Sequence, residues 1–319
     1  MSTSSARIWL LHAAVLLALL LAQPLLPEYH YVNVARILVL ACYAVGYNVL
    51  LGYTGLMSLG HAMFFALGMY GAGLPVYYHG VGALPALALG VAASALGAAL
   101  FGLIALRTRG VAFLIVTMMF GQAFHLTLLH FNVYTLGDQG FILSETIRTL
   151  DVAGAAFDLA DSRVKYNAAL GVFSVCLLAS LLLVRSPVGR VLVAIRENED
   201  RTRLLGYNTY LARLLALTVS GTIAGAAGAT YALLFSYVGA SFASILHSIY
   251  PLLWTLLGGA GTTLGPLLGT GLMFYLEIYA RDLTTAYLVV VGAVLLVLVL
   301  WAPRGILGTL RDRKARWLP

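Results

Sequence analysis

The sequence predicts an all-α fold, a polytopic bundle of about ten transmembrane helices with glycine-rich, broken or re-entrant segments. Three observations predict this fold. Hydrophobic residues make up 61% of the 319 residues and charged residues only 10%, whereas a soluble domain has about 25% charged residues. The apolar residues fall into runs long enough to cross a bilayer. Basic residues collect in alternate connections between these runs, as they do in membrane proteins.

Ten apolar runs are candidate spans, because a helix needs about 20 apolar residues to cross the hydrocarbon core. They cover residues 8–26, 33–51, 60–79, 84–106, 111–131, 166–184, 212–237, 245–258, 264–280 and 283–302. The eighth is short and could be re-entrant. The first could instead be a cleaved signal peptide, because Arg7 precedes an apolar run, although the run is long for one. The whole chain, 1–319, is expected to form one transmembrane domain.

The distribution of charge predicts the orientation. With the N-terminus in the cytoplasm, the connector 185–213 and the tail 303–319 are inside, and they hold most of the 19 basic residues. Positive residues favour the cytoplasmic side, so both termini are predicted to be cytoplasmic. The net charge of +7 then reflects orientation rather than nucleic-acid binding. The outer, periplasmic loop 132–165 is acidic, with Asp138, Glu145, Asp151, Asp158 and Asp161, and the basic residues left outside are Arg36, Arg148, Arg163, Lys165 and Arg281.

Small residues recur every four positions in two spans, which is the pattern that lets helix backbones approach closely in a membrane. We therefore expect these two faces to pack against neighbouring helices. They are Gly90, Ser94, Ala98 and Gly102 in the fourth span, and Ser220, Ala224 and Gly228 in the seventh.

Two segments interrupt the apolar pattern with several glycines and hydroxyl residues. They are GYTGLMSLGH at 52–61 and LGGAGTTLGP at 257–266. Glycine lets the backbone leave the helix, and Pro266 suits the first turn of a restarted helix. Irregular backbone at membrane depth is tolerated where it is buried in protein or lines a cavity, and paired interruptions indicate a translocation pathway. Two tight cytoplasmic turns explain the pattern equally well.

Polar residues within the spans add further candidates. Gln122 and His125 lie three apart on the fifth span, near Thr117, and an interhelical hydrogen bond is the favoured interpretation. Glu277 and Arg281, four apart, are expected to form an ion pair on the helix surface. Asn48 is close enough to the first interruption to satisfy its freed backbone groups. The candidate pathway residues are Gly52, Tyr53, Thr54, Gly55, Ser58, Gly60, His61, Thr117, Gln122, Gly258, Gly259, Gly261, Thr262, Gly265 and Pro266.

The connector 185–213 is the most informative hydrophilic segment. Residues 190–205 are compatible with a short amphipathic helix, and Gly206 followed by Asn208 is a plausible helix stop. Such a helix could dock a soluble partner, although runs of charge are more often solvated connectors. The two lysines of the chain do not belong to a G-x-x-x-x-G-K-[ST] phosphate loop, so ATP-driven transport would need a separate motor subunit. Cys42 and Cys176 show neither a disulfide framework nor a metal-binding spacing.

Five segments, taken in chain order, closely resemble the motifs of permease subunits of bacterial branched-chain amino-acid ABC importers, and they fit the LivM-type subunit best. Together they extend over nearly the whole chain. The segments are GYTGLMSLGHAMFFALGMYGAG (52–73), FLIVTMMFGQ (113–122), AIRENEDRTRLLGYN (194–208), LGGAGTTLGPLLGT (257–270) and WAPRGILG (301–308).

The resemblance implies an inner-membrane permease that works with other chains: a second permease subunit, two ATP-binding cassette subunits that bind ATP and Mg, and a periplasmic solute-binding protein. No cofactor, metal or catalytic residue is expected in this chain. The resemblance also implies that the glycine-rich segments shape the pathway and that residues 196–206 form a coupling helix seated in the ATPase subunit. The candidate coupling residues are Arg196, Glu197, Asn198, Glu199, Arg203 and Gly206.

The sequence departs from the family in two places and leaves the substrate open. Residues 201–203 read Arg-Thr-Arg where alanine is usual, and residues 136–140 read LGDQG where the family often has GGSDG. Similar permeases import urea, short amides or aromatic acids. A secondary transporter working alone is the remaining alternative, but it would need a relay of intramembrane acids or histidines, and Glu277 is the main candidate for one.

Overall fold

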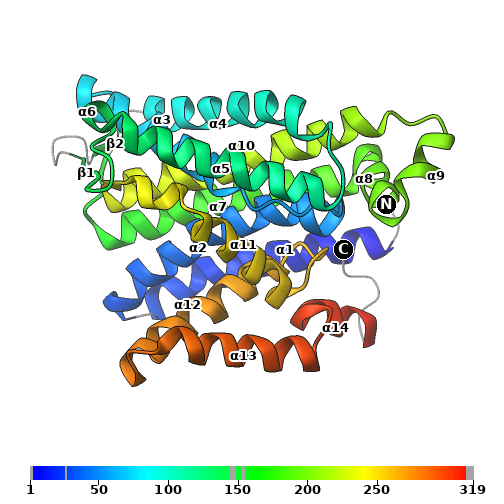
Figure 1. Cartoon of the computed structure of the whole chain (residues 1–319). Coiled ribbons are helices and arrows are strands. Elements are labelled where there is room, and N and C mark those ends of the chain that lie inside the picture. The colour runs from blue at the N-terminus through cyan, green and yellow to red at the C-terminus, as the bar shows by residue number, and fades with distance from the viewer. Residues whose placement is uncertain (1–2, 26, 144–148, 153–154, 314–319) are drawn as a thin grey trace.

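The computed structural model is a bundle of long helices that run roughly antiparallel to one another (Figure 1). It describes residues 3–25, 27–143, 149–152 and 155–313. A helix occupies most of each predicted span, so the predicted helical membrane bundle is confirmed. Glu145 and Arg148 lie outside the described residues. The helices are α1 (Thr3–Ala22), α2 (Glu28–Asn48), α3 (Ala62–His79), α4 (Ala83–Ala105), α5 (Val111–His130), α7 (Ser162–Arg185), α10 (Thr209–Phe235), α11 (Ile245–Gly258), α12 (Gly265–Leu283) and α13 (Tyr287–Trp301).

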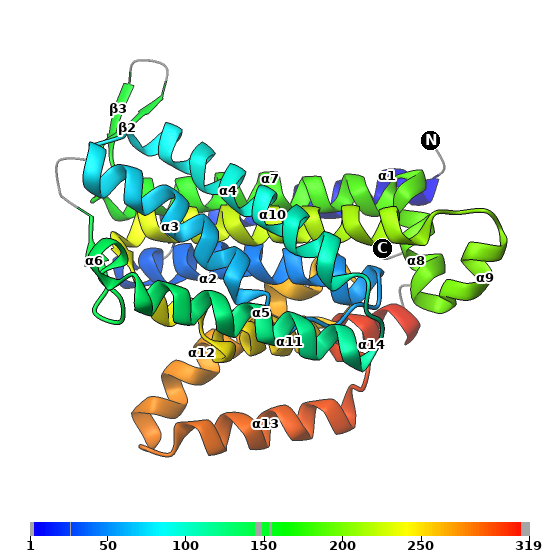
Figure 2. The same cartoon turned by 45° about the horizontal axis from the view of Figure 1, so that its top comes forward.

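The shorter elements divide between the two ends of the bundle. The start of α1, the helices α8 and α9 and the C-terminal α14 lie at one end, and α6 and β1 to β3 lie at the other (Figures 1 and 2). The connector and the chain ends therefore share a side, as an even number of crossings requires. These elements are α6 (Asn132–Thr135), β1 (Phe141–Ile142), β2 (Thr149–Val152), β3 (Ala155–Asp158), α8 (Pro187–Glu197), α9 (Glu199–Leu204) and α14 (Gly305–Arg313).

Five of the described helices are long and apolar enough to cross a membrane by themselves: α2 with its C-terminal extension, α4, α5, α7 and α10. By contrast α11 has 14 residues, or about 21 Å of helix, which is shorter than the hydrocarbon core of about 30 Å. The chain before it is irregular, with a short strand β4 (Tyr237–Val238) and a 3-10 turn η4 (Ala240–Ala243). The helix predicted at 245–258 is therefore too short to cross by itself.

The described part of the loop 132–165 contains a short helix and three short strands. Its β1 pairs antiparallel with β4, which places Phe141 opposite Val238, and β2 and β3 form a hairpin. Aromatic and β-branched residues favour such pairing. The loop is thus tied to the irregular stretch that follows α10.

The central helix α10 packs against α4 through small residues, which on α4 are those that the sequence predicts as a packing face. Ser94 donates a hydrogen bond of 2.6 Å to the carbonyl oxygen of Gly221, and a Cβ built on Gly225 would lie 2.0 Å from the Cβ of Ser94. The predicted face of α4 is buried along its whole length. The small side chains therefore permit this close approach, as expected.

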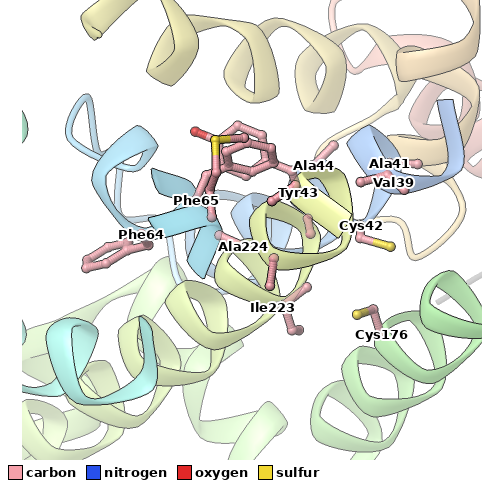
Figure 3. Packing of buried hydrophobic residues seen from close by; sticks show 14 of the residues in the cluster. Val39, Ala41, Cys42, Tyr43, Ala44, Phe64, Phe65, Cys176, Ile223 and Ala224 are labelled. Carbon is pink, nitrogen blue, oxygen red and sulfur yellow. The ribbon is translucent and has the colours of Figure 1, made fainter. Parts of the chain in front are cut away.

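The predicted face of α10 packs against α2 and α3: Ser220 donates a hydrogen bond to the carbonyl oxygen of Gly46, and a Cβ built on Gly228 would lie 1.9 Å from the carbonyl oxygen of Phe65. Larger side chains pack around this contact, as Figure 3 shows. Tyr43 of α2 and Phe65 of α3 have ring centroids 4.9 Å apart, beside Ala224 of α10. Cys42 and Cys176 face one another between α2 and α7 (Figure 3), and both are free and buried. The core thus holds α2, α3, α7 and α10 in fixed relation.

Candidate functional site

The first glycine-rich interruption follows the end of the regular helix α2. After Asn48 the chain winds into a π-helix, η2 (Val49–Tyr53), and then leaves the helix until α3 begins. Thr54 closes this turn by donating a 2.9 Å hydrogen bond to the carbonyl oxygen of Val49. Tyr53, Thr54 and Ser58 are buried, so this segment is not a solvated turn. Single π-helical turns are frequent at functional sites.

The second interruption separates α11 from α12. Gly259 and Gly261 have φ values of 121° and 75°, which favour glycine. Thr262 donates from its hydroxyl to the carbonyl oxygen of Gly259 over 2.7 Å. Pro266 lies in the first turn of α12, as predicted.

The two interruptions contact each other through Asn48, and together we call residues 52–61 and 257–266 the glycine junction. The side-chain oxygen of Asn48 accepts a hydrogen bond of 2.9 Å from the amide of Gly261, and its amide nitrogen donates over 2.9 Å to the carbonyl oxygen of Thr262. Asn48 was expected to satisfy the freed backbone groups of the first interruption. It bonds instead to backbone groups of the second interruption.

His61 is enclosed by aromatic rings on the first side of the glycine junction. It is fully buried, and its ring stacks on Tyr43 with centroids 5.7 Å apart. Its Nε2 lies 3.3 Å from the hydroxyl of Ser220. The candidate His61 thus links α3 to α2 and α10 and does not face an open path.

The fifth span contacts the glycine junction through Thr117 and Gly121. A Cβ built on Gly60 would lie 1.9 Å from the carbonyl oxygen of Thr117, so these two backbones touch. Gln122 is exposed, whereas His125 forms the expected bond between segments, with Nδ1 3.0 Å from the carbonyl oxygen of Ala240. The structure therefore brings Thr117, but not Gln122, to the junction.

The connector forms two helices, which corrects the single helix predicted over residues 190–205. Asn198 lies between α8 and α9 in an extended conformation, and its side chain accepts a hydrogen bond from the amide of Arg201 over 2.9 Å. Such an N-cap starts a new helix, and the acidic Glu199 and Asp200 in its first turn support it. Gly206 follows α9 with a φ of 88°, as expected for a residue that ends a helix.

Glu199 fixes α9 to the base of α10. Its carboxylate lies 3.2 Å from the guanidinium of Arg213, which is buried, and accepts a 3.1 Å hydrogen bond from the hydroxyl of Thr209. Arg203 binds the same carboxylate over 3.3 Å. Two of the candidate coupling residues, Glu199 and Arg203, therefore hold the connector in place.

Two further residues of the connector were missed by the sequence analysis. Leu204 and Leu205, at the end of α9, are 88% and 76% exposed. They lie in a segment that projects beyond the long helices (Figure 2). Neighbouring apolar side chains exposed on a projecting segment mark a candidate protein contact. In the sequence, two leucines directly after a charged run were the signal that could have identified them.

Arg196 links the connector to the glycine junction. Its guanidinium donates a hydrogen bond to the carbonyl oxygen of Gly52, and a Cβ built on Gly55 would lie 3.0 Å from its Cγ. Arg311 of α14 donates over 2.8 Å to the carbonyl oxygen of Gly261. Two arginines from the connector end thus reach the two halves of the junction, while Glu197 is exposed.

A cavity of about 520 Å³ lies in the other half of the bundle, between α2, α3, α10, α11 and α12. It lies outside the candidate pathway residues. Arg36, assigned above to an outside connection, lies in α2 and lines it. The predicted ion pair of Glu277 and Arg281 is confirmed at 2.5 Å. The other residues that line the cavity are Tyr29, Asn33, Leu40, Tyr43, Phe65, Tyr231, Phe242, His247, Tyr250, Trp254, Phe274 and Ile278.

Comparisons with known proteins extend over nearly the whole chain. Residues 31–300 match the family described as the permease component of branched-chain amino acid transport systems. The chain is 29% identical over 317 residues to the high-affinity branched-chain amino acid transport permease LivM of Salmonella typhimurium, covering 93% of this chain and 75% of the relative.

LivM of Escherichia coli is also 29% identical, over 322 residues that cover 95% of this chain and 76% of the relative. A probable branched-chain amino acid transport permease of Methanocaldococcus jannaschii is 33% identical over 88 residues, which cover 27% of this chain and 26% of the relative. No solved structure matches the chain.

Proposed function

This chain belongs to the family of permease components of branched-chain amino acid transport systems, and we propose that it forms part of the translocation pathway of an ATP-driven importer. Its substrates are branched-chain or related hydrophobic amino acids, as the names of the LivM relatives suggest. The energy comes from ATP hydrolysis in a separate subunit, and the chain itself catalyses no reaction.

The proposed assembly places the chain in the bacterial inner membrane beside a second permease subunit. Two ATP-binding cassette subunits lie against the end that carries α8, α9 and α14, and a solute-binding protein docks at the opposite end. The basic residues of α8 and α9 support a cytoplasmic position for the first end. The exposed Leu204 and Leu205 support a protein contact there.

The observation that carries the proposal is the hydrogen bond from Arg196 to Gly52. Because Arg196 belongs to α8 and Gly52 to the first interruption, a displacement of α8 changes the position of the π-helical turn directly. Asn48 passes the displacement to Gly261 and so to α12. The connector thus acts on both interruptions at once, as alternating access driven by a motor subunit requires. ATP and solute can shift such a balance only through their different affinities for the two states.

Reconstitution tests the proposal. The chain is purified together with the subunits encoded beside it, inserted into liposomes and supplied with labelled leucine and the solute-binding protein. We expect uptake that requires ATP and the ATPase subunits. Labelled urea, a short amide and phenylalanine are compared in parallel to identify the substrate class. Transport of solute by the chain alone, without any ATPase subunit, would show instead a secondary transporter.

A further inference from the structure

We propose that the 520 Å³ cavity beside Arg36 is a binding site for a zwitterionic amino acid with an apolar side chain. This inference rests on the proposed function and names residues that hold the solute. Its size falls in the range of about 300–1,000 Å³ that is usual for small-molecule sites. Tyr29 and Arg281 mark its outer part, near the ends of α2 and α12 that point away from α8 and α9 (Figure 1).

Arg36 supplies an uncompensated positive charge to the cavity. Its Nε is buried and makes no hydrogen bond with the residues that the structure describes. Its guanidinium lies 4.9 Å from the centroid of the Phe235 ring, which orients the group without satisfying its donors. Arg36 is half-buried and forms no ion pair with the residues that the structure describes, so a bound ligand can supply its acidic partner. A carboxylate is the group that fits its paired donors.

Asn33 lies one helical turn before Arg36, on the same face of α2. Its side-chain nitrogen is also buried without a partner among the described residues. Both orphaned groups are hydrogen-bond donors and both line the cavity. Two unsatisfied donors on one helix face favour an anionic group between them, because each carries a desolvation cost until it is bonded.

The second charged group of the cavity is an ion pair. Glu277 and Arg281 cancel each other's charge, and the pair uses only Oε1 of Glu277. Oε2 of Glu277 can therefore accept a hydrogen bond from an ammonium group. The cavity as a whole keeps one net positive charge, that of Arg36, which explains why the carboxylate is the dominant contact.

The remaining wall is aromatic and suits an apolar side chain. Tyr250 and Trp254 of α11 stack with ring centroids 5.8 Å apart, and Phe65 of α3 stacks on Phe242 at 5.9 Å. Burying a leucine-sized side chain against such a wall removes its apolar surface from water and so favours binding. A positive group at one side and aromatic rings at the other therefore select an amino acid over a neutral amide.

Fluorescence of Trp254 tests the site directly, because this residue lines the cavity. The other tryptophans are replaced (Trp9→Phe, Trp301→Phe and Trp317→Phe) in the full chain within its complex. We expect leucine to change the emission with saturation, and leucinamide, which lacks the carboxylate, to bind about tenfold more weakly or less. Equal binding of the two, or no response to leucine, would overturn the proposal.

Substitution of Arg36 provides the second arm. Arg36→Gln should weaken leucine binding about tenfold or more, and Arg36→Lys, which keeps the charge, should weaken it less. Arg163→Gln removes an exposed charge at the same end of the bundle, outside the cavity, and should bind as the parent does. Binding by Arg36→Gln that equals the control would refute the assignment.

Uptake by the complex separates this inference from the proposed function. If the parent complex imports leucine and Arg36→Gln imports it equally well, the site is wrong and the function stands. If leucine binds at Trp254 but no complex imports it, the site stands and the function is wrong.

Discussion

Asn48 and Gly261, which lie 213 positions apart in the sequence, are joined by a hydrogen bond of 2.9 Å. The same amide side chain also donates to Thr262, so one residue at the end of α2 fills both the donor and the acceptor positions of the second interruption. No other side-chain type of this size carries a donor and an acceptor with this geometry. The glycine junction therefore depends on an asparagine as much as on its glycines.

Asn48→Ala should destabilise the protein strongly. The substitution leaves the amide of Gly261 and the carbonyl of Thr262 buried without partners, at about 1–3 kcal/mol for each group. Thermal unfolding in detergent measures the loss. Asn132→Ala, at an exposed position of α6, is the matched control and should unfold as the parent does. A common melting temperature for both variants would contradict the role of Asn48.

Gly52→Ala should prevent the junction from closing. Its Cβ would lie 2.0 Å from the side-chain oxygen of Asn48 and 2.4 Å from the amide nitrogen of Gly261, and neither atom belongs to a flexible chain end. We expect lost uptake in reconstituted complexes. Gly171→Ala on α7, where nothing lies within 4 Å, is the control, and it should be neutral or stabilising by up to about 1 kcal/mol. Normal uptake by Gly52→Ala would exclude a tight junction.

The long helices could be predicted from the sequence because the thickness of the bilayer sets the length of an apolar run. The small-residue faces could be predicted because small side chains permit close packing of helices. The interruptions could be located too, since glycine clusters stand out in apolar runs. Their mutual contact could not, because Asn48 and Gly261 meet only through the tertiary fold. The division of the connector at Asn198 was missed for a different reason. The charge pattern of the connector is compatible with one helix, and the N-cap hydrogen bond of Asn198 is what starts a second helix.

The cavity was missed because its residues come from five α-helices and the 3-10 turn η4 and form no motif. One signal was present. Arg36 falls within the predicted span 33–51, and a charge inside a span marks a functional site by default; the assignment to an outside connection discarded it. Gln122 shows the opposite error, since a polar residue within a span faces outward here. Neither case could be resolved without knowing which face of each helix is buried.

Gly206→Val should uncouple ATP hydrolysis from uptake. Nothing lies within 4 Å of a Cβ at this position, but φ is 88°, so a β-branched residue is strained by about 1–2 kcal/mol and shifts the end of α9. The ratio of leucine imported to ATP hydrolysed should fall while insertion into the membrane is retained. Gly206→Asn, which tolerates this conformation better, should have a smaller effect. An unchanged ratio in the valine variant would remove Gly206 from the coupling path.

Replacing both Leu204 and Leu205 with serine should weaken the complex without unfolding the chain. Their exposure of 88% and 76% means that the chain alone gains little from them, whereas a partner would bury them at about 25 cal/mol per Å² of apolar surface. Co-purification of the ATPase subunits measures the effect. Val133→Ser, 76% exposed at the opposite end, is the control. Full retention of the ATPase by the double variant would mean that the tip of α9 is not covered by it.

Glu199→Gln should loosen the connector from α10. The neutral amide leaves the buried guanidinium of Arg213 without its charged partner at 3.2 Å, and such a loss costs about 1–3 kcal/mol. Glu197→Gln, which removes an exposed charge two residues earlier, should cost little, since exposed charges contribute about 0–1 kcal/mol. Limited proteolysis of the segment 198–208 is the direct measurement, and Glu199→Gln should be cut faster. Raised salt should not reproduce the effect in the parent, because a partly buried pair is screened weakly. Equal cleavage of the two variants would mean that the hydroxyl of Thr209 and the N-cap at Asn198 hold α9 without the ion pair.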